Sequence, residues 1–444
     1  DIRKEGSAYD LPLTIGMLAA TGEITGHRLG EFIIMGELSL DGTLRPIKGA
    51  LPIGFQAKKE GFRGFILPVQ NAREAAIVDG LEVFGVTTLK EAIDILEEKD
   101  GHLQPIDVGD RSEFFKIKDD YAVDFSDVRG QETMKRALEI AAAGGHNSIL
   151  IGPPGAGKTM LARRLSTILP PFTLEEALET TKIHSVAGVL QHGSAMVTTR
   201  PFRAPHHTIS DVALVGGGSN PMPGEISLAH NGVLFLDELP EFKRTVLEVM
   251  RQPLEEQTVV ISRAKVSVEY PANFMLVSSM NPCPCGYYNH PDKDCVCGPG
   301  IVKRYLSKIS GPLLDRIDLH VEVTPVSYDE LSRRERPSET SEKIRDRVIK
   351  AREAQIVRFA EHKGIYANAH MPSHLVRQFC DLDDQCATLL KTAMERLKLS
   401  ARAYDRILKV SRTIADLGSS TDIKSDHLME AIHYRSLDRE GWAG

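Results

Sequence analysis

Eight consecutive residues have the types and order of a loop that binds phosphate groups. Glycines there let successive backbone N–H groups surround an anion, and a helix that opens directly afterwards favours negative charge at its N-terminus. A chance glycine-rich turn would lack the strand-like run 148–151 before it and the helical run after it. We expect Lys158 to reach the β- and γ-phosphates of a nucleotide and the Thr159 hydroxyl to bind Mg²⁺. The loop consists of Gly152, Pro153, Pro154, Gly155, Ala156, Gly157, Lys158 and Thr159.

Two carboxylates follow an apolar run, as the second half of such a site requires. The run 232–236 has the pattern of a buried parallel strand, and Asp237 and Glu238 come directly after it. We expect Asp237 to hold the Mg²⁺ shell and Glu238 to polarise the attacking water. An acidic helix cap after a strand is the alternative, and the phosphate-binding loop upstream favours the catalytic interpretation.

Four cysteines stand within fifteen positions of the chain, namely Cys283, Cys285, Cys295 and Cys297. Two C-x-C pairs on one stretch offer four thiolates, which suit tetrahedral Zn²⁺ in a structural site. Because C-x-C pairs are less usual than C-x-x-C pairs, reduced structural cysteines or a redox pair are the alternatives. Cys380 and Cys386 stand apart from this group, and we expect both to be core cysteines.

The composition excludes several classes of protein. Apolar residues (42%) and charged residues (26%) have ordinary globular values, which excludes disordered and collagen-like chains. Apolar runs are far shorter than the ~20 residues of a membrane helix, and six cysteines in 444 residues are too few for a disulfide framework. We therefore expect a cytoplasmic protein with no membrane segment. The net charge of −7 argues against a surface coated in basic charge, although a local basic site remains open.

Strand-like and helical runs divide the chain into three parts and a linker. Residues 1–98 alternate short strands with helices, and the polar stretch 99–120 has the composition of a linker. Residues 121–335 alternate strands with helices, which implies a parallel sheet, and residues 336–444 have helical periodicity almost throughout. The predicted fold class is α/β, with a nucleotide-binding parallel sheet and a C-terminal helical lid. Because the chain begins at Asp1 in what looks like the middle of a domain, we expect residues to be missing ahead of it.

Three further polar residues resemble functional positions of the AAA+ ATPases. Asn281 ends the strand-like run 274–281 and resembles sensor 1, with an asparagine in a turn as the alternative. Arg316 resembles the arginine finger that enters the neighbouring subunit's site, with a surface salt bridge as the alternative. Arg402, on a helix of the third part, resembles sensor 2. Arg406, one turn further along, is the other candidate for that role, and a plain solvated arginine is the third interpretation.

Two insertions resemble those of the AAA+ branch that contains magnesium chelatases and replicative helicases. The lysine of the phosphate-binding loop and the first acidic residue lie 79 positions apart, which leaves room for a helix-2 insert. That insert contains His206 and His207, which we expect to be structural rather than metal ligands. A second insertion, 257–270, has the pattern of two short strands with Arg263 and Lys265 at their tip. Because both inserts typically project into a central pore, we expect Arg263 and Lys265 to contact DNA phosphates, with a solvated turn as the alternative.

Longer motifs resemble the ComM/YifB family of bacterial magnesium-chelatase-like ATPases, and the resemblance covers essentially the whole chain. It implies a homo-hexameric DNA motor that hydrolyses ATP and promotes branch migration during natural transformation, acting on single-stranded and branched DNA. The motor subunit of a metal-inserting chelatase and an ATP-dependent protease are the alternatives. The motifs are Phe202-Arg-Ala-Pro-His-His-Thr-Ile-Ser, Ser279-Met-Asn-Pro-Cys-Pro-Cys-Gly-Tyr-Tyr, Gly311-Pro-Leu-Leu-Asp-Arg-Ile-Asp-Leu-His and Leu399-Ser-Ala-Arg-Ala-Tyr-Asp-Arg-Ile.

Residues 1–98 resemble the C-terminal part of a Lon-type protease domain, as the first domain of that family does. Ala8 stands at the position of the nucleophilic serine and Leu51 at that of the catalytic lysine, and Ser7 and Lys48 are near misses. Serine–lysine catalysis needs both groups within hydrogen-bond reach of each other. We therefore expect an inactive protease fold ahead of the AAA+ core, kept for DNA binding or ring architecture.

Overall fold

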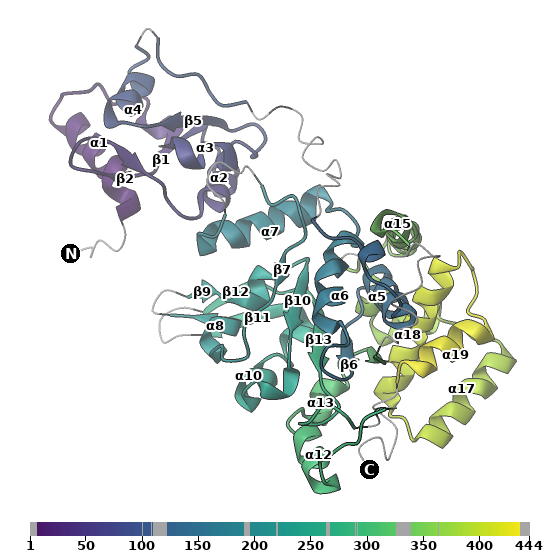
Figure 1. Ribbon diagram of the computed structural model, residues 1–444. Coiled ribbons are helices and arrows are strands. Elements are labelled where there is room, and N and C mark those ends of the chain that lie inside the picture. Colours follow the sequence, from purple (N-terminus) through teal and green to yellow (C-terminus); the bar gives the residue numbers. More distant parts are fainter. Residues whose placement is uncertain are drawn as a thin grey trace. The chain divides into compact units, whose positions relative to one another are not determined.

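The computed structural model divides the chain into two compact units (Figure 1). The first unit contains residues 1–117 and 172–199, and the second contains residues 118–171 and 200–444. None of the helices in the described residues has both the length and the apolar character needed to cross a membrane. The residues that the structure describes are 7–99, 101–107, 109, 122–190, 196–218, 221–262, 267–288, 290, 292–325, 339–362 and 364–435.

The first unit is an α/β arrangement around a small parallel sheet. Its strands are β1 (Phe32–Ile34), β2 (Glu37–Leu38), β3 (Leu44–Arg45), β4 (Gly64–Pro68) and β5 (Glu82–Val86), and its helices before residue 100 are η1 (Ser7–Tyr9), α1 (Asp10–Ala20), η2 (Leu29–Glu31), α2 (Ala50–Lys59), α3 (Val69–Ala75) and α4 (Leu89–Leu96). The sheet order is β1–β4–β5, and every residue of the central strand β4 is buried. Phe65 and Leu67 enter the core beside α2 and α3, and Ile66 enters the core beside α1 and α4. Successive side chains of β4 thus cover both faces, as a buried parallel strand requires.

Helix α7 (Leu174–Ala187) also belongs to the first unit, although the sequence analysis counts it within 121–335. The helix begins at a capping box, in which the Thr173 hydroxyl accepts a hydrogen bond from the Glu176 amide. Phe172 and Ala177 are buried in the same apolar cluster as α2 and α3. The sequence periodicity of α7 predicts a helix, but it does not show against which hydrophobic core the apolar side of this helix packs.

The second unit contains a parallel sheet of five strands in the order β14–β6–β13–β10–β7. These strands are β6 (Ser148–Ile151), β7 (Phe202–Arg203), β10 (Val233–Leu236), β13 (Met275–Met280) and β14 (Leu319–Glu322). The registers pair Ile151 with Met280 and Leu236 with Ser278, so β6, β13 and β10 end at one edge of the sheet. Together with the helical C-terminal region, this sheet confirms the predicted α/β fold of an AAA+ ATPase.

Helices cover both faces of this sheet, and two small hairpins extend from it. The helices are η4 (Phe125–Asp127), α5 (Glu132–Gly144), α6 (Lys158–Arg164), η5 (Leu165–Thr167), α8 (Asp211–Val215), α9 (Glu225–Leu228), η6 (Leu239–Glu241), α10 (Arg244–Val249), α11 (Pro253–Glu256), α12 (Pro299–Leu306) and α13 (Gly311–Leu314). The hairpins are the antiparallel pairs β8 (Gly216–Gly217)–β9 (Met222–Pro223) and β11 (Thr258–Ser262)–β12 (Ser267–Pro271). Leu150 joins the core beside α5 and the C-terminal helices, whereas Ile149 and Ile151 join the core beside α10 and β11. The two strands predicted within 257–270 are confirmed.

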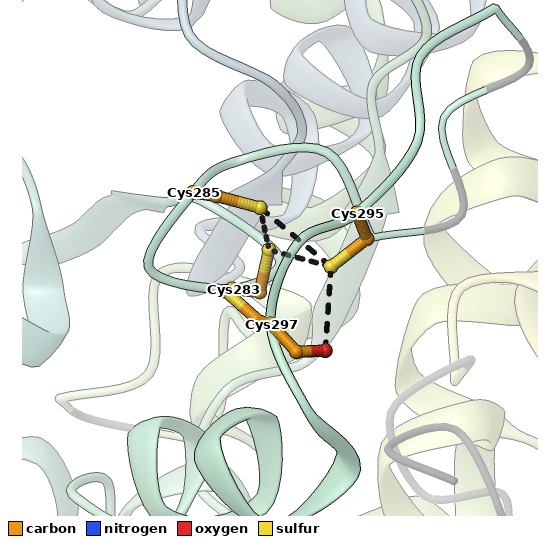
Figure 2. A group of neighbouring side chains, drawn as sticks. All are labelled: Cys283, Cys285, Cys295 and Cys297. Carbon is orange, nitrogen blue, oxygen red and sulfur yellow. Dashed lines mark hydrogen bonds between the residues drawn. The ribbon is translucent and has the colours of Figure 1, made fainter.

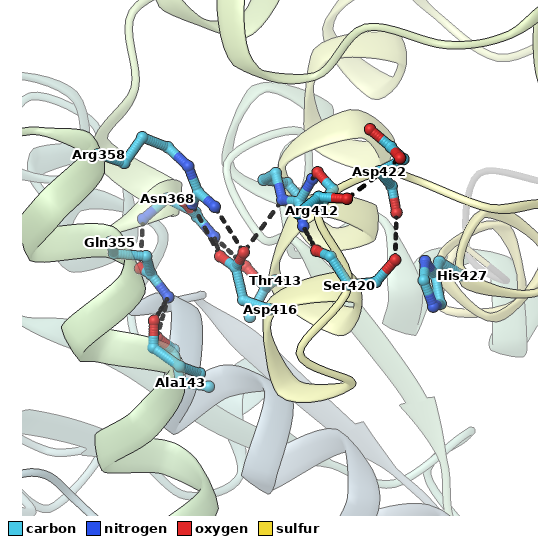
Figure 3. Close-up of polar contacts among 12 residues, drawn as sticks. Ala143, Gln355, Arg358, Asn368, Arg412, Thr413, Asp416, Ser420, Asp422 and His427 are labelled. Carbon is cyan, nitrogen blue, oxygen red and sulfur yellow. Dashed lines mark hydrogen bonds and ion pairs between the residues drawn. The ribbon is translucent and has the colours of Figure 1, made fainter.

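The C-terminal part is helical, as predicted, and a buried polar network stabilises it. Its helices are α15 (Ser341–Arg358), η7 (Asn368–His370), α16 (Ser373–Phe379), α17 (Asp384–Leu397), α18 (Ala401–Leu417) and α19 (Ser425–His433). Figure 3 shows Asp416 of α18 between two guanidinium groups: Arg358 donates at 2.6 and 2.8 Å and Arg412 at 3.1 Å. Gln355 donates to the Ala143 carbonyl at 2.9 Å, which ties α15 to α5. Buried charges that are paired in this way fix one arrangement of the helices.

Candidate nucleotide site and four-cysteine cluster

The phosphate-binding loop joins the end of β6 to the start of α6, as the sequence predicts. Gly157, directly before α6, has φ +85°, a left-handed conformation that side chains disfavour. Gly152 allows no side chain for a different reason, since a Cβ atom there would lie 2.4 Å from the Val323 carbonyl oxygen. The two glycines therefore fix the start and the end of the loop. The N-terminus of α6 opens directly behind it, a place that favours phosphate.

Lys158 is a buried cation at the centre of the loop. Its ammonium donates hydrogen bonds to the carbonyls of Gly152 (2.7 Å) and Pro153 (2.9 Å), and to the side-chain oxygen of Asn281 (3.2 Å). Burial lowers the pKa of Lys158 to about 8, and the carboxylates of Asp237 and Glu238 oppose that shift. The structure thus brings Asn281, at the end of β13, to the lysine of the phosphate-binding loop. An anion would be a stronger partner for this ammonium than neutral carbonyl groups are.

The carboxylate of Asp237 accepts hydrogen bonds from two hydroxyl groups. Thr159 donates to one carboxylate oxygen at 2.7 Å, and Ser279 of β13 donates to the other. A hydroxyl and a carboxylate at the end of a phosphate-binding loop form a donor set that suits Mg²⁺, so Thr159 and Asp237 fit that ion. The sequence places Ser279 in a family motif but does not predict this contact. The available signal is its position two residues before Asn281, because residues two apart on a strand share a face.

Glu238 has a strained backbone and an exposed carboxylate. Its φ of +55° lies in the left-handed region, which is uncommon outside glycine and is often found at functional sites. The side chain is 58% exposed, and its Oε2 lies 3.6 Å from Nδ1 of His207. His206 stacks on His207 with ring centroids 4.1 Å apart. The sequence predicts structural roles for both histidines and does not indicate that His207 lies near the expected base.

The three arginines that resemble catalytic positions lie away from the phosphate-binding loop. Arg316 precedes β14, whose first residue pairs with Ser148 at the start of β6, so Arg316 lies at the opposite edge of the sheet from the loop. Its guanidinium contacts Glu255 and donates to the Pro312 carbonyl at 2.7 Å.

Arg402 and Arg406 extend from α18 toward the same segment. Arg402 lies 3.5 Å from Asp315, and Arg406 contacts the buried carboxylate of Asp318. The Arg406 guanidinium helps to hold the pKa of Asp318 well below its usual range, against the opposing effect of burial. Arg316, Arg402 and Arg406 line one cleft of about 520 Å³ together with Lys409. All three arginines therefore gather at one place, at a distance from Lys158 and Asp237.

The four cysteines of 283–297 converge on one another (Figure 2). The Sγ atom of Cys283 lies 3.3 Å from that of Cys285 and 3.7 Å from that of Cys295, and Cys285 and Cys295 are 3.6 Å apart. All four sulfur atoms, including that of Cys297, lie within 4.8 Å of one another. No other group of three or more potential metal ligands occurs among the described residues. The arrangement can bind a single metal ion.

The other two cysteines have the environment of core residues. Cys380 and Cys386 are buried in the apolar cluster of the helical lid. Burial raises the pKa of Cys380 to about 12 and that of Cys386 to about 11. A thiol with a raised pKa is a poor nucleophile and a poor metal ligand.

In the described residues of the first unit, Ser7 and Lys48 have partners other than each other. Leu51 is fully buried, and the Ser7 hydroxyl donates to Glu37 at 2.5 Å. Lys48 lies against Gly188, where an added Cβ atom would come within 2.6 Å of the Lys48 Cε atom. No hydrogen bond joins Ser7 to Lys48 in the described part of the chain.

The expected DNA-binding residues Arg263 and Lys265 lie outside the described residues. The arms of their hairpin are described as far as Ser262 and Ser267, which are paired with each other. On the first arm, Val259 and Ile261 are buried, so one face of the hairpin packs against the second unit.

Comparisons with known proteins agree with this architecture. Residues 124–331 match the family described as "Magnesium chelatase, subunit ChlI", residues 338–435 match "Magnesium chelatase, subunit ChlI C-terminal", and residues 1–71 match "Subunit ChlI of Mg-chelatase".

Two curated proteins are similar to almost the whole chain, and a third is similar to about half of it. "Uncharacterized protein YifB" of Escherichia coli (strain K12) is 44% identical over 441 residues, which are 99% of this chain and 84% of that protein. "Competence protein ComM" of Haemophilus influenzae is 44% identical over 442 residues, with the same coverage of 99% and 84%. "Magnesium-chelatase 67 kDa subunit" of Chlorobaculum parvum is 27% identical over 207 residues, which are 46% of this chain and 27% of that protein.

Proposed function

The chain belongs to the ComM/YifB family of magnesium-chelatase-like AAA+ ATPases, and from this membership we propose that it is an ATP-hydrolysing motor that moves on DNA. The ATPase part rests on one observation. Lys158, Asp237 and Asn281 meet where neighbouring parallel strands end, which is where such sheets bind their ligands.

Each residue at this edge has a separate part in hydrolysis. Lys158 binds the β- and γ-phosphates, and Thr159 and Asp237 hold Mg²⁺, which offsets negative charge on those phosphates. Glu238 orients the attacking water and accepts its proton, a role that suits a carboxylate exposed at the end of β10. Asn281 positions the same water from the neighbouring strand.

Arg316 and Arg402 act in this proposal on the site of a neighbouring copy. Both lie at the edge of the sheet opposite the chain's own phosphate-binding loop. An arginine finger has to reach the transferred phosphoryl group, so a cyclic homo-oligomer supplies what a single copy cannot. The resemblance to AAA+ motors favours a homo-hexamer.

The substrate of the motor is single-stranded and branched DNA, and the reaction that it promotes is branch migration in natural transformation. This part of the proposal comes from the family resemblance and from the word "competence" in the name of the Haemophilus relative. In this proposal Arg263 and Lys265, which follow β11 in the sequence, supply the phosphate contacts.

A second candidate is the motor subunit of a magnesium-chelatase-type complex, because the matched families carry that name. Such subunits normally lack a four-cysteine loop, which is present here, and a protease-like domain, which we expect in residues 1–98. The test is ATP hydrolysis with and without single-stranded or branched DNA. Stimulation by DNA supports the motor, and an unchanged rate across all DNA forms favours the chelatase class.

Zinc is the metal that we assign to the four-cysteine cluster. Four thiolates without an imidazole or carboxylate ligand suit a closed structural Zn²⁺ site. Tetrahedral ligation at the usual Zn–S distance places sulfur atoms about 3.8 Å apart. Three of the sulfur pairs lie at 3.3–3.7 Å, close to that spacing.

A further inference from the structure

We propose that the ion held by Cys283, Cys285, Cys295 and Cys297 fixes Asn281 and the phosphate-binding loop in place, so that ATP turnover depends on the metal although the metal touches no nucleotide. The inference rests on the proposed ATPase function and adds a control element to it. It assigns the four cysteines the role of positioning residues.

The first ligand follows the sensor residue almost directly. Only Pro282 separates Asn281 from Cys283, so their Cα atoms are at most about 7 Å apart along the chain. Cys283 is fully buried, and Asn281 accepts a hydrogen bond from Lys158. A shift of Cys283 would therefore move the side chain that contacts the loop lysine.

The bend of the cysteine loop lies directly against the phosphate-binding loop. Gly286 follows Cys285 and has φ +84°, and a Cβ atom added there would lie 2.5 Å from Cδ of Pro154. The Gly286 amide also donates to the Cys283 carbonyl at 3.0 Å, which closes a tight turn between the first two ligands. Pro154 thus packs on backbone that the metal would hold.

The segment after the last ligand returns to the same residues. Cys297 is followed by α12. Burial raises the pKa of Tyr305 in α12 and the backbone amide of Asn281 opposes that shift, so the Tyr305 hydroxyl lies beside Asn281. Lys308, just beyond α12, lies 3.4 Å from Glu241, which belongs to the 3₁₀ helix that begins directly after Glu238. Both ends of the cysteine loop are therefore attached to the hydrolytic site.

Most of the described residues between Cys283 and Cys297 are exposed or half-buried. Its described residues form no helix or strand, and Val296 is 85% exposed. An exposed stretch without regular secondary structure gains order from a cross-link, and a metal ion bound by residues near both ends provides one. Loss of the ion would release the stretch that bears on Asn281 and Pro154.

The test compares two substitutions of one ligand. Cys297→Ser removes a zinc ligand, whereas Cys297→His replaces it by another group that zinc accepts. We expect the serine variant to lose zinc by elemental analysis, to bind an ATP analogue nearly normally, and to turn over about 10- to 100-fold more slowly. The histidine variant should retain both zinc and turnover. Asp294→Asn, at an exposed position of the same loop, is the control and should behave as the wild type.

A second measurement keeps the inference separate from the ATPase proposal and from misfolding of a variant. Amide hydrogen exchange of the wild-type chain is compared before and after removal of zinc by a chelator under reducing conditions. We expect faster exchange in 152–158 and at Asn281, with no change in the buried stretch 407–416 of α18. Unchanged exchange at the phosphate-binding loop, or full turnover by a zinc-free Cys297→Ser variant, would overturn the inference. A zinc-loaded wild type that shows this exchange response but hydrolyses no ATP would overturn the proposed function alone.

Discussion

The Lys158 ammonium lies 3.2 Å from the side-chain oxygen of Asn281, so a direct hydrogen bond joins the phosphate-binding loop to the end of β13. The two residues are far apart in sequence: Lys158 begins α6, after the loop that follows β6, and Asn281 directly follows β13, the strand that pairs with β6. A bound γ-phosphate would interact with both groups, because the lysine binds it and the asparagine positions the water that attacks it. This contact is the basis on which nucleotide binding and hydrolysis can be separated by mutation.

Glu238→Gln should bind ATP but hydrolyse it about 10²- to 10⁴-fold more slowly, since only the acceptor of the water's proton is removed. Lys158→Ala is the contrasting variant, and it should lose both hydrolysis and most nucleotide binding because the phosphates lose their cation. Equilibrium binding of a labelled ATP analogue, measured beside steady-state turnover, distinguishes the two. Wild-type turnover by Glu238→Gln would show that another group is the base, and His207 would be the next residue to test.

The affinity of the nucleotide-free protein for ATP should decrease as the pH rises above about 8. Burial lowers the pKa of Lys158 to about 8, so above that pH the ammonium loses its proton and the phosphates lose their counter-charge. The expected decrease is about tenfold per pH unit, measured by binding between pH 7 and pH 9.5. Lys158→Arg is the control, because its guanidinium stays charged and its affinity, although weaker, should not follow this profile. A flat profile for the wild type would contradict the lowered pKa.

Arg316→Ala should bind ATP normally in its own site yet lose about 10³-fold in turnover, the effect expected of a missing arginine finger. Mixing it with Lys158→Ala should restore part of the activity, because each variant supplies the group that the other lacks across an interface. Glu255→Gln, which removes the partner of Arg316 within the chain, should keep its activity. Full turnover by a monomeric Arg316→Ala protein would exclude the proposed role.

The sequence predicts the site better than it predicts the surroundings of the site. Strand patterns and glycine spacing place Lys158, Asp237 and Asn281 at the ends of parallel strands, and such ends meet at one edge. The roles of Ser279 and His207 are not predicted, because a serine in a strand and a histidine in an insert do not by themselves indicate which residues they contact. Their partners are decided by strand order and by the path of a long insertion.

Helix α7 shows the same limit at the level of the fold. Its periodicity and its capping box identify a helix, but the core that it joins contains Leu51 and Phe65, more than a hundred residues earlier. The partners of Arg316 and Arg402 are likewise set by tertiary structure. Glu255 and Asp315 become their neighbours only once the sheet and the helical lid have packed together.

The double substitution Arg263→Ala/Lys265→Ala should weaken DNA binding while basal ATP hydrolysis continues. Each lost phosphate contact lowers the slope of log affinity against log salt by about 0.7 to 0.9, so the salt dependence should become flatter. The matched control is Lys391→Ala/Arg396→Ala, which removes the same charge from exposed positions of α17. Equal DNA affinity of the two double variants at two salt concentrations would assign the DNA contact to another surface.

The central claim is that ATP hydrolysis drives movement on DNA, and the most direct measurement is the release of a labelled strand from a branched DNA substrate. The account predicts release that requires ATP, stops with a non-hydrolysable analogue, and is lost in Glu238→Gln although that variant still binds ATP. Vigorous ATP hydrolysis by the wild type without any strand release, and with no stimulation by DNA, would contradict it.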